Sequence, residues 1–449
     1  MKSKYILLAF TLLLGGCLPY ITQPTATMDL PLIEPRTDSV VIIEPTPVPP
    51  ISQGADVFLP ELGNAPPEGT PEQAKAGGDN AIGEMYAEDI EARTKIGLTE
   101  DNIPVMMQEN NGRYHFDRLS PDEQRLYVEI LTVTETYSHD IIISTMEPEN
   151  IEKIFQCVLN DHPEIFYAIG YGFKRYSKEG ETVKISFSAT YSIGVAEKER
   201  RKLLIDAYVE TCLSQMAPHF DDYGKTKFIY EYLINNTEYD LMAADNQNIC
   251  SVFIGGRSVC QGYAKATQYL LNVAGIPATL VTGKIMGGDG HAWNIALLDG
   301  EYYHMDSTFG DSSFSMDAAG APYGSGSNFS DDSYINHDFL NVTTKQIERT
   351  HIIESILPIV ECTAIKDNYY IREGLYFDSV DADKLQMLFE REYERGSEYI
   401  SLKCADDEVY ADMLHFLLDE QRVFDYLRGS DGVVRYLDSA ERLSISFWL

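Results

Sequence analysis

The chain has 449 residues, which is enough for two or three domains of ordinary size, each with its own hydrophobic core. Hydrophobic residues make up 44% of it and charged residues 23%, a composition that predicts a mostly globular protein. The formal net charge is −35, from 35 basic and 70 acidic residues, and no cluster of Lys and Arg stands out. The charge therefore argues against nucleic acid as a partner.

The N-terminal segment has the pattern of an export signal. Lys2 and Lys4 precede an apolar run, residues 5–14, that is too short to cross a bilayer. The run ends in Leu-Gly-Gly followed by Cys17, which resembles the lipobox of bacterial lipoproteins. The resemblance implies that residues 1–17 are a lipoprotein signal peptide. It also implies that lipidated Cys17 anchors the protein on the extracytoplasmic face of the cell membrane; a soluble secreted protein is the alternative.

A proline-rich segment follows the signal. Twelve of the twenty prolines fall between Pro19 and Pro71, among Thr, Glu, Gly and Ser residues. Such a segment buries too little apolar surface to offset its ordering entropy, so it is expected to be an extended spacer. We predict a disordered tether over residues 18–104, with order beginning between about residues 83 and 104.

The next segment predicts helices and a hairpin. A helix start is indicated at Ser120, where a capping hydroxyl, a proline and two acids stand in sequence. A second helix is expected after Pro148 and a third over residues 196–216. Residues 165–176 and 182–193 are strand-like, the second by its alternation of apolar and polar side chains.

The C-terminal segment predicts a small α+β domain without apparent chemistry. We expect strands at residues 369–371, 399–403, 433–437 and 443–448, and helices at 382–393 and 408–427. Five segments are predicted in all. They are the signal peptide (1–17), the tether (18–104), an N-terminal α+β domain (105–220), a central domain (221–345) and a C-terminal α+β domain (346–449).

The cysteines are too few for a disulfide scaffold. Six remain in more than 400 residues once Cys17 is set aside, and none forms a Cys-x-x-Cys pair. Their pairing cannot be read from spacing. They are Cys157, Cys212, Cys250, Cys260, Cys362 and Cys404.

Cys260 stands where a loop gives way to a helix. The apolar residues that follow it have helical spacing, Gly275 ends the helix and Pro277 prevents its continuation. At a helix N-terminus, the partial positive charge stabilises a thiolate, and the free N–H groups can hold an oxyanion. Taken alone, the residue would more often be a buried structural cysteine.

A hairpin after this helix carries a base and an acid. A strand is expected over residues 278–285, and Asp299-Gly300 predicts a two-residue turn joining strands 291–298 and 301–306. In that register one face of the hairpin carries His291, Trp293, Ile295, Tyr302, His304 and Asp306. His291 and Asp306 are then diagonal neighbours, roughly 7–8 Å apart along the backbone, a span that their side chains can close into a hydrogen bond.

Other polar and aromatic residues of the hairpin are weaker candidates for the catalytic site. Asp299 lies about 26 Å from His291 along an extended strand and cannot orient it. His304 is expected to be structural or to support the site from behind. Trp293 and Tyr302 are expected in the core, where they could also wall an active-site cleft.

These segments resemble the successive motifs of the transglutaminase-like superfamily. The motifs are Val259-Cys260-Gln261-Gly262-Tyr263-Ala264, Ala274-Gly275-Ile276-Pro277, His291-Ala292-Trp293-Asn294 and Tyr303-His304-Met305-Asp306-Ser307-Thr308. The resemblance implies an α+β fold with a papain-like core, in which the cysteine helix packs on an antiparallel sheet, and a catalytic triad of Cys260, His291 and Asp306. A side-chain oxyanion donor of the family cannot be placed, and Gln247 and Gln261 are only weak candidates.

The resemblance implies an enzyme that attacks peptide or amide bonds of a substrate at the cell surface and passes through an acyl-enzyme. No metal or cofactor is expected, since a zinc site built from the same three residues would lack a fourth ligand. Hydrolysis is favoured because Gly-rich residues 286–290 and the Ser/Gly-rich stretch after Asp306 suggest an open rim. A cross-linking transglutaminase and a non-catalytic binding module are the alternatives.

Overall fold

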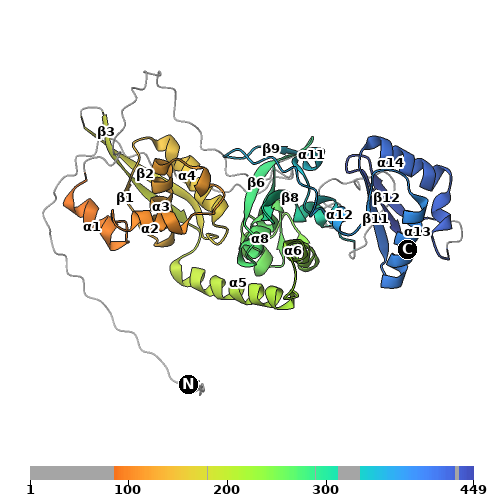
Figure 1. Ribbon diagram of the computed structural model, residues 1–449. Helices are drawn as coiled ribbons and strands as arrows, with labels where there is room; N and C mark the ends of the chain where they lie inside the picture. Colours follow the sequence, from red (N-terminus) through yellow and green to blue (C-terminus); the bar gives the residue numbers. More distant parts are fainter. Residues whose placement is uncertain (1–84, 179–180, 289, 312–333, 430–433) are drawn as a thin grey trace, which may run out of the picture. The chain divides into compact units, whose positions relative to one another are not determined.

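The computed structural model describes residues 85–178, 181–288, 290–311, 334–429 and 434–449 (Figure 1). The predicted signal peptide, Cys17 and residues 18–84 of the predicted tether lie outside these ranges. Among the described residues, no helix combines the length and apolar character that crossing a membrane requires.

The N-terminal elements surround a three-stranded sheet in the order β1-β3-β2. Helix α3 packs against α4 and against strands β1 and β3. The elements are α1 (Ala87–Lys95), α2 (Ile103–Glu109), the 3₁₀ turn η1 (Phe116–Arg118), α3 (Pro121–Glu135), β1 (Ile141–Ile143), α4 (Pro148–Asp161), β2 (Ala168–Lys178), β3 (Glu181–Tyr191) and α5 (Val195–Gln215).

Local capping explains where α3 begins. The Ser120 hydroxyl accepts from the backbone N–H of Glu123, and the Glu123 carboxylate accepts from the N–H of Ser120. This reciprocal pair satisfies two N–H groups that the first turn of a helix leaves free. The helix start predicted at Ser120 is confirmed.

The first described residue, 85, falls within the range predicted for the onset of order, residues 83–104, and helix α1 lies within the last part of the predicted tether. Helix α1 is tied down by Arg93, whose side chain is buried and pairs with the Glu129 carboxylate of α3 at 2.8 Å. The same guanidinium donates to the carbonyl of Ile142. A buried charge that is paired and hydrogen-bonded can hold a polar helix on a core, and hydrophobic spacing does not reveal this.

The central elements form a four-stranded antiparallel sheet in the order β8-β7-β6-β9, with helix α8 packed on β6 and β7 (Figure 1). They are α6 (Asp222–Asn236), β4 (Glu238–Tyr239), α7 (Ile249–Phe253), β5 (Arg257–Ser258), α8 (Cys260–Val273), β6 (Ala278–Ile285), β7 (Gly290–Leu298), β8 (Glu301–Met305), α9 (Ser307–Gly310), the 3₁₀ turn η2 (His337–Phe339), α11 (Thr344–Ile347) and β9 (His351–Ile353).

The predicted register of the β7–β8 hairpin is confirmed up to the end of β8. Leu298 pairs with Glu301, and Ile295 pairs with His304. The turn residues Asp299 and Gly300 have φ angles of 49° and 88°, as a type I′ hairpin requires. Strand β8 then stops at Met305, so Asp306 does not pair with β7 as the extended register predicted.

Strand β9 was not anticipated from the sequence. It pairs with β6, which aligns Gly283 with Ile353 and Ile285 with His351. A Cβ atom on Gly283 would lie 1.9 Å from the Ile352 carbonyl oxygen and 2.9 Å from the Trp293 ring. The glycine is therefore required for β9 to lie against β6 and for the indole to cross the strand.

The C-terminal elements form a second four-stranded sheet, in the order β10-β11-β13-β12, around a hydrophobic core of its own. They are α12 (Tyr369–Arg372), β10 (Tyr376–Phe377), α13 (Ala382–Arg395), β11 (Tyr399–Cys404), α14 (Asp407–Leu414), a π-helical turn (His415–Asp419), a 3₁₀ turn (Arg422–Asp425), β12 (Tyr436–Ser439) and β13 (Ser444–Trp448).

Two predictions for the C-terminal segment were wrong. Residues 369–371, predicted as a strand, are helical because the Asn368 side chain caps α12 by accepting from the N–H of Tyr370. The single helix predicted over residues 408–427 ends early, since Gln421 takes a left-handed conformation with φ of 59° that no α-helix accommodates.

Candidate active site

Cys260 is the first residue of α8, and its side chain is fully buried. The residue before it is Val259, whose side chain provides no capping hydrogen bond. Most helices place Ser, Thr, Asp or Asn there to bind the first N–H groups. The apolar cap therefore leaves the positive end of α8 without a side-chain acceptor, directly beside the sulfur.

The next turn of α8 explains the glycine of the Cys-Gln-Gly motif. A Cβ atom on Gly262 would lie 2.0 Å from the Ser258 hydroxyl and 2.9 Å from the Asn246 carbonyl oxygen. The Ser258 hydroxyl is itself bonded to that of Ser251 at 2.6 Å. Gly262 thus allows the start of α8 to lie against this hydroxyl pair, which sets the position of Cys260.

The structure brings the three residues predicted as a triad together. The Nε2 atom of His291 lies 2.7 Å from Oδ2 of Asp306, and both side chains are buried. The Cys260 side chain lies beside His291 and contributes to raising the pKa of the imidazole. Because Nε2 is engaged by Asp306, we assign Nδ1 as the nitrogen that faces sulfur.

Asp306 is held through every polar atom that it carries. Its Oδ1 atom accepts the N–H groups of Thr308 and Phe309 and so caps α9. Its backbone N–H donates to the carbonyl of Phe339, and its carbonyl oxygen accepts from the Tyr230 hydroxyl. The carboxylate is therefore fixed in orientation before any substrate arrives.

The charges of the pair follow from these contacts. Burial alone would raise the pKa of Asp306, but the histidine charges and hydrogen bonds hold it far below its usual range. Burial alone would lower the pKa of His291, but the Asp306 charge and hydrogen bond, with a smaller contribution from Cys260, raise it to about 10. At neutral pH the pair is accordingly an imidazolium and a carboxylate.

A second histidine meets the same carboxylate oxygen, and the sequence did not point to it. The Nε2 atom of His351, on β9, lies 3.1 Å from Oδ2 of Asp306. Burial lowers the pKa of His351 more strongly than the Asp306 hydrogen bond and charge raise it. Its place in the site depends on the pairing of β9 with β6, and the sequence contains no local signal for that pairing.

Aromatic rings enclose the two histidines. The ring centroid of Phe309 lies 5.1 Å from that of His291 and 4.9 Å from that of His351. Trp293 stacks on His291 and lies 4.9 Å from His351, and the ring centroid of Phe339 lies 5.6 Å from that of His351. Trp293 is thus a buried ring against His291, and its role as a cleft wall stays a prediction. The exposed fractions of Cys260, His291 and Asp306 are 0%, 1% and 1%, so the site is closed.

His304 supports this wall from behind. Its Nδ1 atom accepts from the Trp293 indole N–H at 3.1 Å, and its Nε2 atom lies 3.1 Å from the Thr344 hydroxyl. Burial lowers the pKa of His304 to about 3, so the ring is neutral. It fixes the indole and does not reach the triad.

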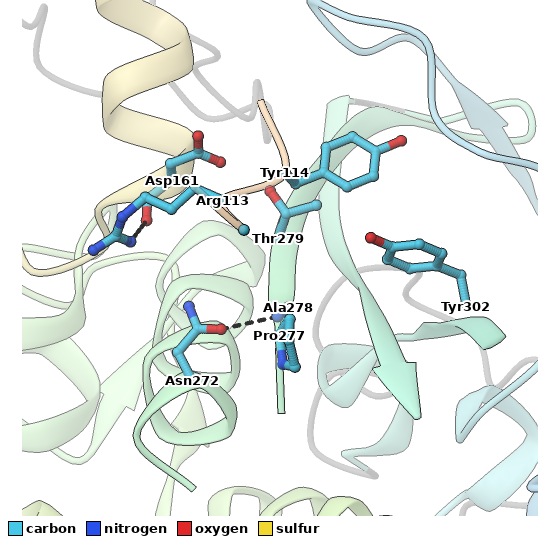
Figure 2. A pocket seen from close by; sticks show the side chains of 9 residues that line it. Arg113, Tyr114, Asp161, Asn272, Pro277, Ala278, Thr279 and Tyr302 are labelled. Carbon is cyan, nitrogen blue, oxygen red and sulfur yellow. Dashed lines mark hydrogen bonds between the residues drawn. The ribbon is translucent and has the colours of Figure 1, made fainter. Parts of the chain in front are cut away.

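Tyr302 lies elsewhere, although it was predicted as a possible cleft wall. It pairs with Leu297 next to the hairpin turn, at the end of the hairpin remote from His291. It lines a cavity of about 60 Å³ together with Tyr114 and Thr279, and Figure 2 shows these side chains. The alternation of the strand places Tyr302 on the predicted face but does not bring it to the site.

The two glutamines considered as oxyanion donors differ in position. The Gln247 amide nitrogen donates to the side-chain oxygen of Asn246 at 3.2 Å, which occupies one of its N–H groups. Gln261 is the second residue of α8, directly after Cys260. Both glutamines stay weak candidates, and the backbone N–H groups at the start of α8 adjoin Cys260 directly.

His291, Asp306 and His351 form the one group in the described part of the chain that could hold a metal ion, with ligand atoms within 4.8 Å of one another. The arrangement of these three side chains fits hydrogen bonding better than metal coordination. Each imidazole Nε2 already meets Oδ2 at hydrogen-bond distance, so both would have to lose a proton to bind a metal. Cys260 is not part of this group.

Comparison with known proteins agrees with this geometry. Residues 211–307 match the profile of the transglutaminase-like superfamily, and the matched range contains Cys260, His291 and Asp306 but not His351. The chain therefore contains a transglutaminase-like domain. A search of curated proteins found no match.

Solved structures with similarity to the chain are distant. One is described as a TGase; it is 18% identical, with a TM-score of 0.24, and the similarity covers 36% of this chain and 49% of that one. Another, from Cytophaga hutchinsonii, is provisionally named a cysteine protease; it is 18% identical, with a TM-score of 0.21, over 30% of this chain and 61% of that one. The chain thus spans less than two thirds of the length of each.

The raised pKa of His291 predicts a specific pH dependence of stability. Folding raises this pKa from an unfolded value of about 6.5 to about 10, so the stabilisation is complete below pH 6.5 and is lost as the pH rises towards 10. We expect the urea midpoint of the wild type to fall between pH 6.5 and 9.5 by more than that of His291→Gln. The difference should be on the order of 2 kcal/mol in unfolding free energy. The same fall in both proteins would contradict the assignment of an imidazolium.

Proposed function

We propose that the protein is an exported enzyme that cleaves peptide or amide bonds with Cys260 as nucleophile, His291 as proton carrier and Asp306 as its orienting acid. The single observation that carries this proposal is the buried His291–Asp306 pair, hydrogen-bonded at 2.7 Å, with Cys260 beside it at a helix N-terminus. The family match supports the same chemistry.

The first half of the reaction forms an acyl-enzyme. The Cys260 sulfur attacks the carbonyl carbon, a C–S bond forms, and the His291 imidazolium gives its Nδ1 proton to the departing amine nitrogen as the C–N bond breaks. Asp306 stays ionised throughout and holds the imidazole by Nε2–H. The carbonyl oxygen gains negative charge in this step, and the uncapped N–H groups at the start of α8 are placed to receive it.

The second half transfers the acyl group from sulfur to an acceptor. We propose water as the acceptor, with neutral His291 taking its proton while the thioester C–S bond breaks. The closed aromatic surroundings of the site favour one second candidate, an amine acceptor, because transamidation needs a site that excludes water. Both reactions share the acyl-enzyme on Cys260.

We propose further that the enzyme is held at the cell membrane by lipidated Cys17 and acts on peptide or protein substrates outside the cytoplasm. The charged start, the apolar run and the Leu-Gly-Gly-Cys pattern support this location. The proline-rich segment would then separate the folded part from the bilayer.

Reactivity of Cys260 can be measured without knowing the substrate. Burial raises the pKa of Cys157, Cys212, Cys362 and Cys404 to about 12 and that of Cys250 to about 11, so these five are thiols near neutral pH. Cys260 has an imidazolium and a helix N-terminus beside it. We expect iodoacetamide at about pH 6 to label Cys260 first, as mapped by mass spectrometry. Equal labelling of all six cysteines, or none at Cys260, would contradict the proposal.

The fate of the acyl group requires two assays on the same protein. The full chain is incubated with a glutamine-containing protein and a labelled primary amine, and in parallel with a peptide library. We expect peptide cleavage that disappears in Cys260→Ala, and little incorporation of amine. Incorporation without cleavage would establish the transamidase instead, and activity that survives in Cys260→Ala would point to a contaminant and to a binding module.

Membrane attachment tests the location separately. We expect Cys17→Ser to release the protein from the membrane fraction of the producing cells, because the lipid cannot be attached. The matched control is Cys157→Ser, which leaves the lipobox intact. A Cys17→Ser protein that stays with the membranes as the wild type does would exclude lipid anchoring at this residue.

A further inference from the structure

The Oδ2 atom of Asp306 accepts from two imidazoles, and only one of them belongs to the proposed triad. His291 approaches it at 2.7 Å from β7 and His351 at 3.1 Å from β9. Both histidines are buried, and His351 lies outside the range matched by the superfamily profile. The family motifs therefore do not explain why a second histidine binds Asp306.

The hydrogen bonds of His351 determine where its proton lies. Its Nδ1 atom is 2.7 Å from the Thr350 hydroxyl. An ionised carboxylate can only accept, so the Nε2 atom that lies 3.1 Å from Asp306 Oδ2 carries the single proton of a neutral imidazole. The unprotonated Nδ1 atom can then accept from the Thr350 hydroxyl, which also lies 3.3 Å from the Ile347 carbonyl oxygen. Asp306 thus requires the tautomer in which His351 is a donor, and the Thr350 hydroxyl is placed to support it.

The groups around His351 leave it neutral. The charged groups that face it are Asp306 and the His291 imidazolium, and the effect of His291 opposes a second positive charge. His304, also neutral, lies near it, and Trp293, Phe309 and Phe339 supply the apolar walls. A phenylalanine ring would suit these walls as well as an imidazole does, so packing alone does not account for the two polar edges of His351.

We propose that His351 is a positioning residue of this active site, which acts through Asp306 by holding Oδ2 and sharing its negative charge with His291. The inference rests on the proposed function. When two donors share one acceptor atom, each weakens the bond of the other, because each draws on the same electron density. His351 thereby limits how tightly Asp306 holds the His291 imidazolium, which must release a proton in each turnover.

Three variants separate this role from simple packing. His351→Gln keeps an N–H donor near the position of Nε2, whereas His351→Phe keeps the ring and removes the donor. Thr350→Val keeps the side-chain shape but removes the hydroxyl that supports the tautomer. Thermal unfolding of each protein shows whether it is folded, and Thr350→Val in the His351→Gln background provides the matched control.

The measurement is NMR of the full chain labelled with ¹⁵N-histidine. We expect His351 to be a neutral Nε2–H tautomer, and the Nε2 protons of both His291 and His351 to resonate far downfield. In His351→Phe, the His291 proton should move further downfield, and His291 should titrate about one pH unit higher. Thr350→Val should shift it in the same direction by less, and His351→Gln should leave it near the wild-type value.

A kinetic readout accompanies the spectra. We expect iodoacetamide alkylation of Cys260 in His351→Gln to follow the wild-type pH profile. Peptide cleavage near neutral pH should fall about tenfold in His351→Phe. Thr350→Val added to His351→Gln should change neither readout, because no imidazole tautomer then remains to be selected.

Four outcomes would overturn the inference. They are an Nδ1–H tautomer at His351, an unshifted His291 resonance in His351→Phe, equal effects of Thr350→Val in both backgrounds, and the loss of both downfield protons when metal is added at stoichiometric amounts, which would make the cluster a metal site. The spectra do not depend on turnover. A wild type that shows them but cleaves no peptide would refute the proposed function alone.

Discussion

The arrangement of the site depends on one buried carboxylate. Asp306 accepts two backbone N–H groups through Oδ1 and two imidazoles through Oδ2, and its main chain is bound on both sides. An ionised carboxylate can be buried only when its oxygens are satisfied in this way. The elements that supply the donors, β7, β9 and α9, are therefore fixed relative to one another by the same group that orients His291.

The end of β8 positions this carboxylate at the start of α9. The strand stops at Met305 and the chain turns into α9, which brings the first N–H groups of that helix to Oδ1. An aspartate that remained in the strand would point at His291 with fewer donors, and its charge would be less stable when buried. Asp306 thus both caps α9 and orients His291. The N–H groups that it caps stabilise the ionised carboxylate, which is the form that can orient the imidazole.

Enclosure of the triad separates its chemistry from bulk solvent. Aromatic rings of Trp293, Phe309 and Phe339 surround the histidines, and His304 holds the indole in place. In such surroundings, the attraction between the imidazolium and Asp306 is stronger than it would be in water. A substrate must displace part of this enclosure to reach Cys260, and the acceptor that follows it decides between hydrolysis and transamidation.

Sequence alone determined the features that depend on local rules. The Asp-Gly turn fixed the hairpin register, because only a few turn types fit two residues, and the glycine and proline after Val273 marked the end of the Cys260 helix. These rules placed Cys260 at a helix start and His291 near Asp306. The tertiary structure decided what depends on distant segments: the early order of α1 through Arg93 and Glu129, the helical form of residues 369–372, and His351 on the shared carboxylate. Strand β9 has three residues, too few to show a period, and its partner β6 lies far away in sequence, so only folding brings that histidine to Asp306.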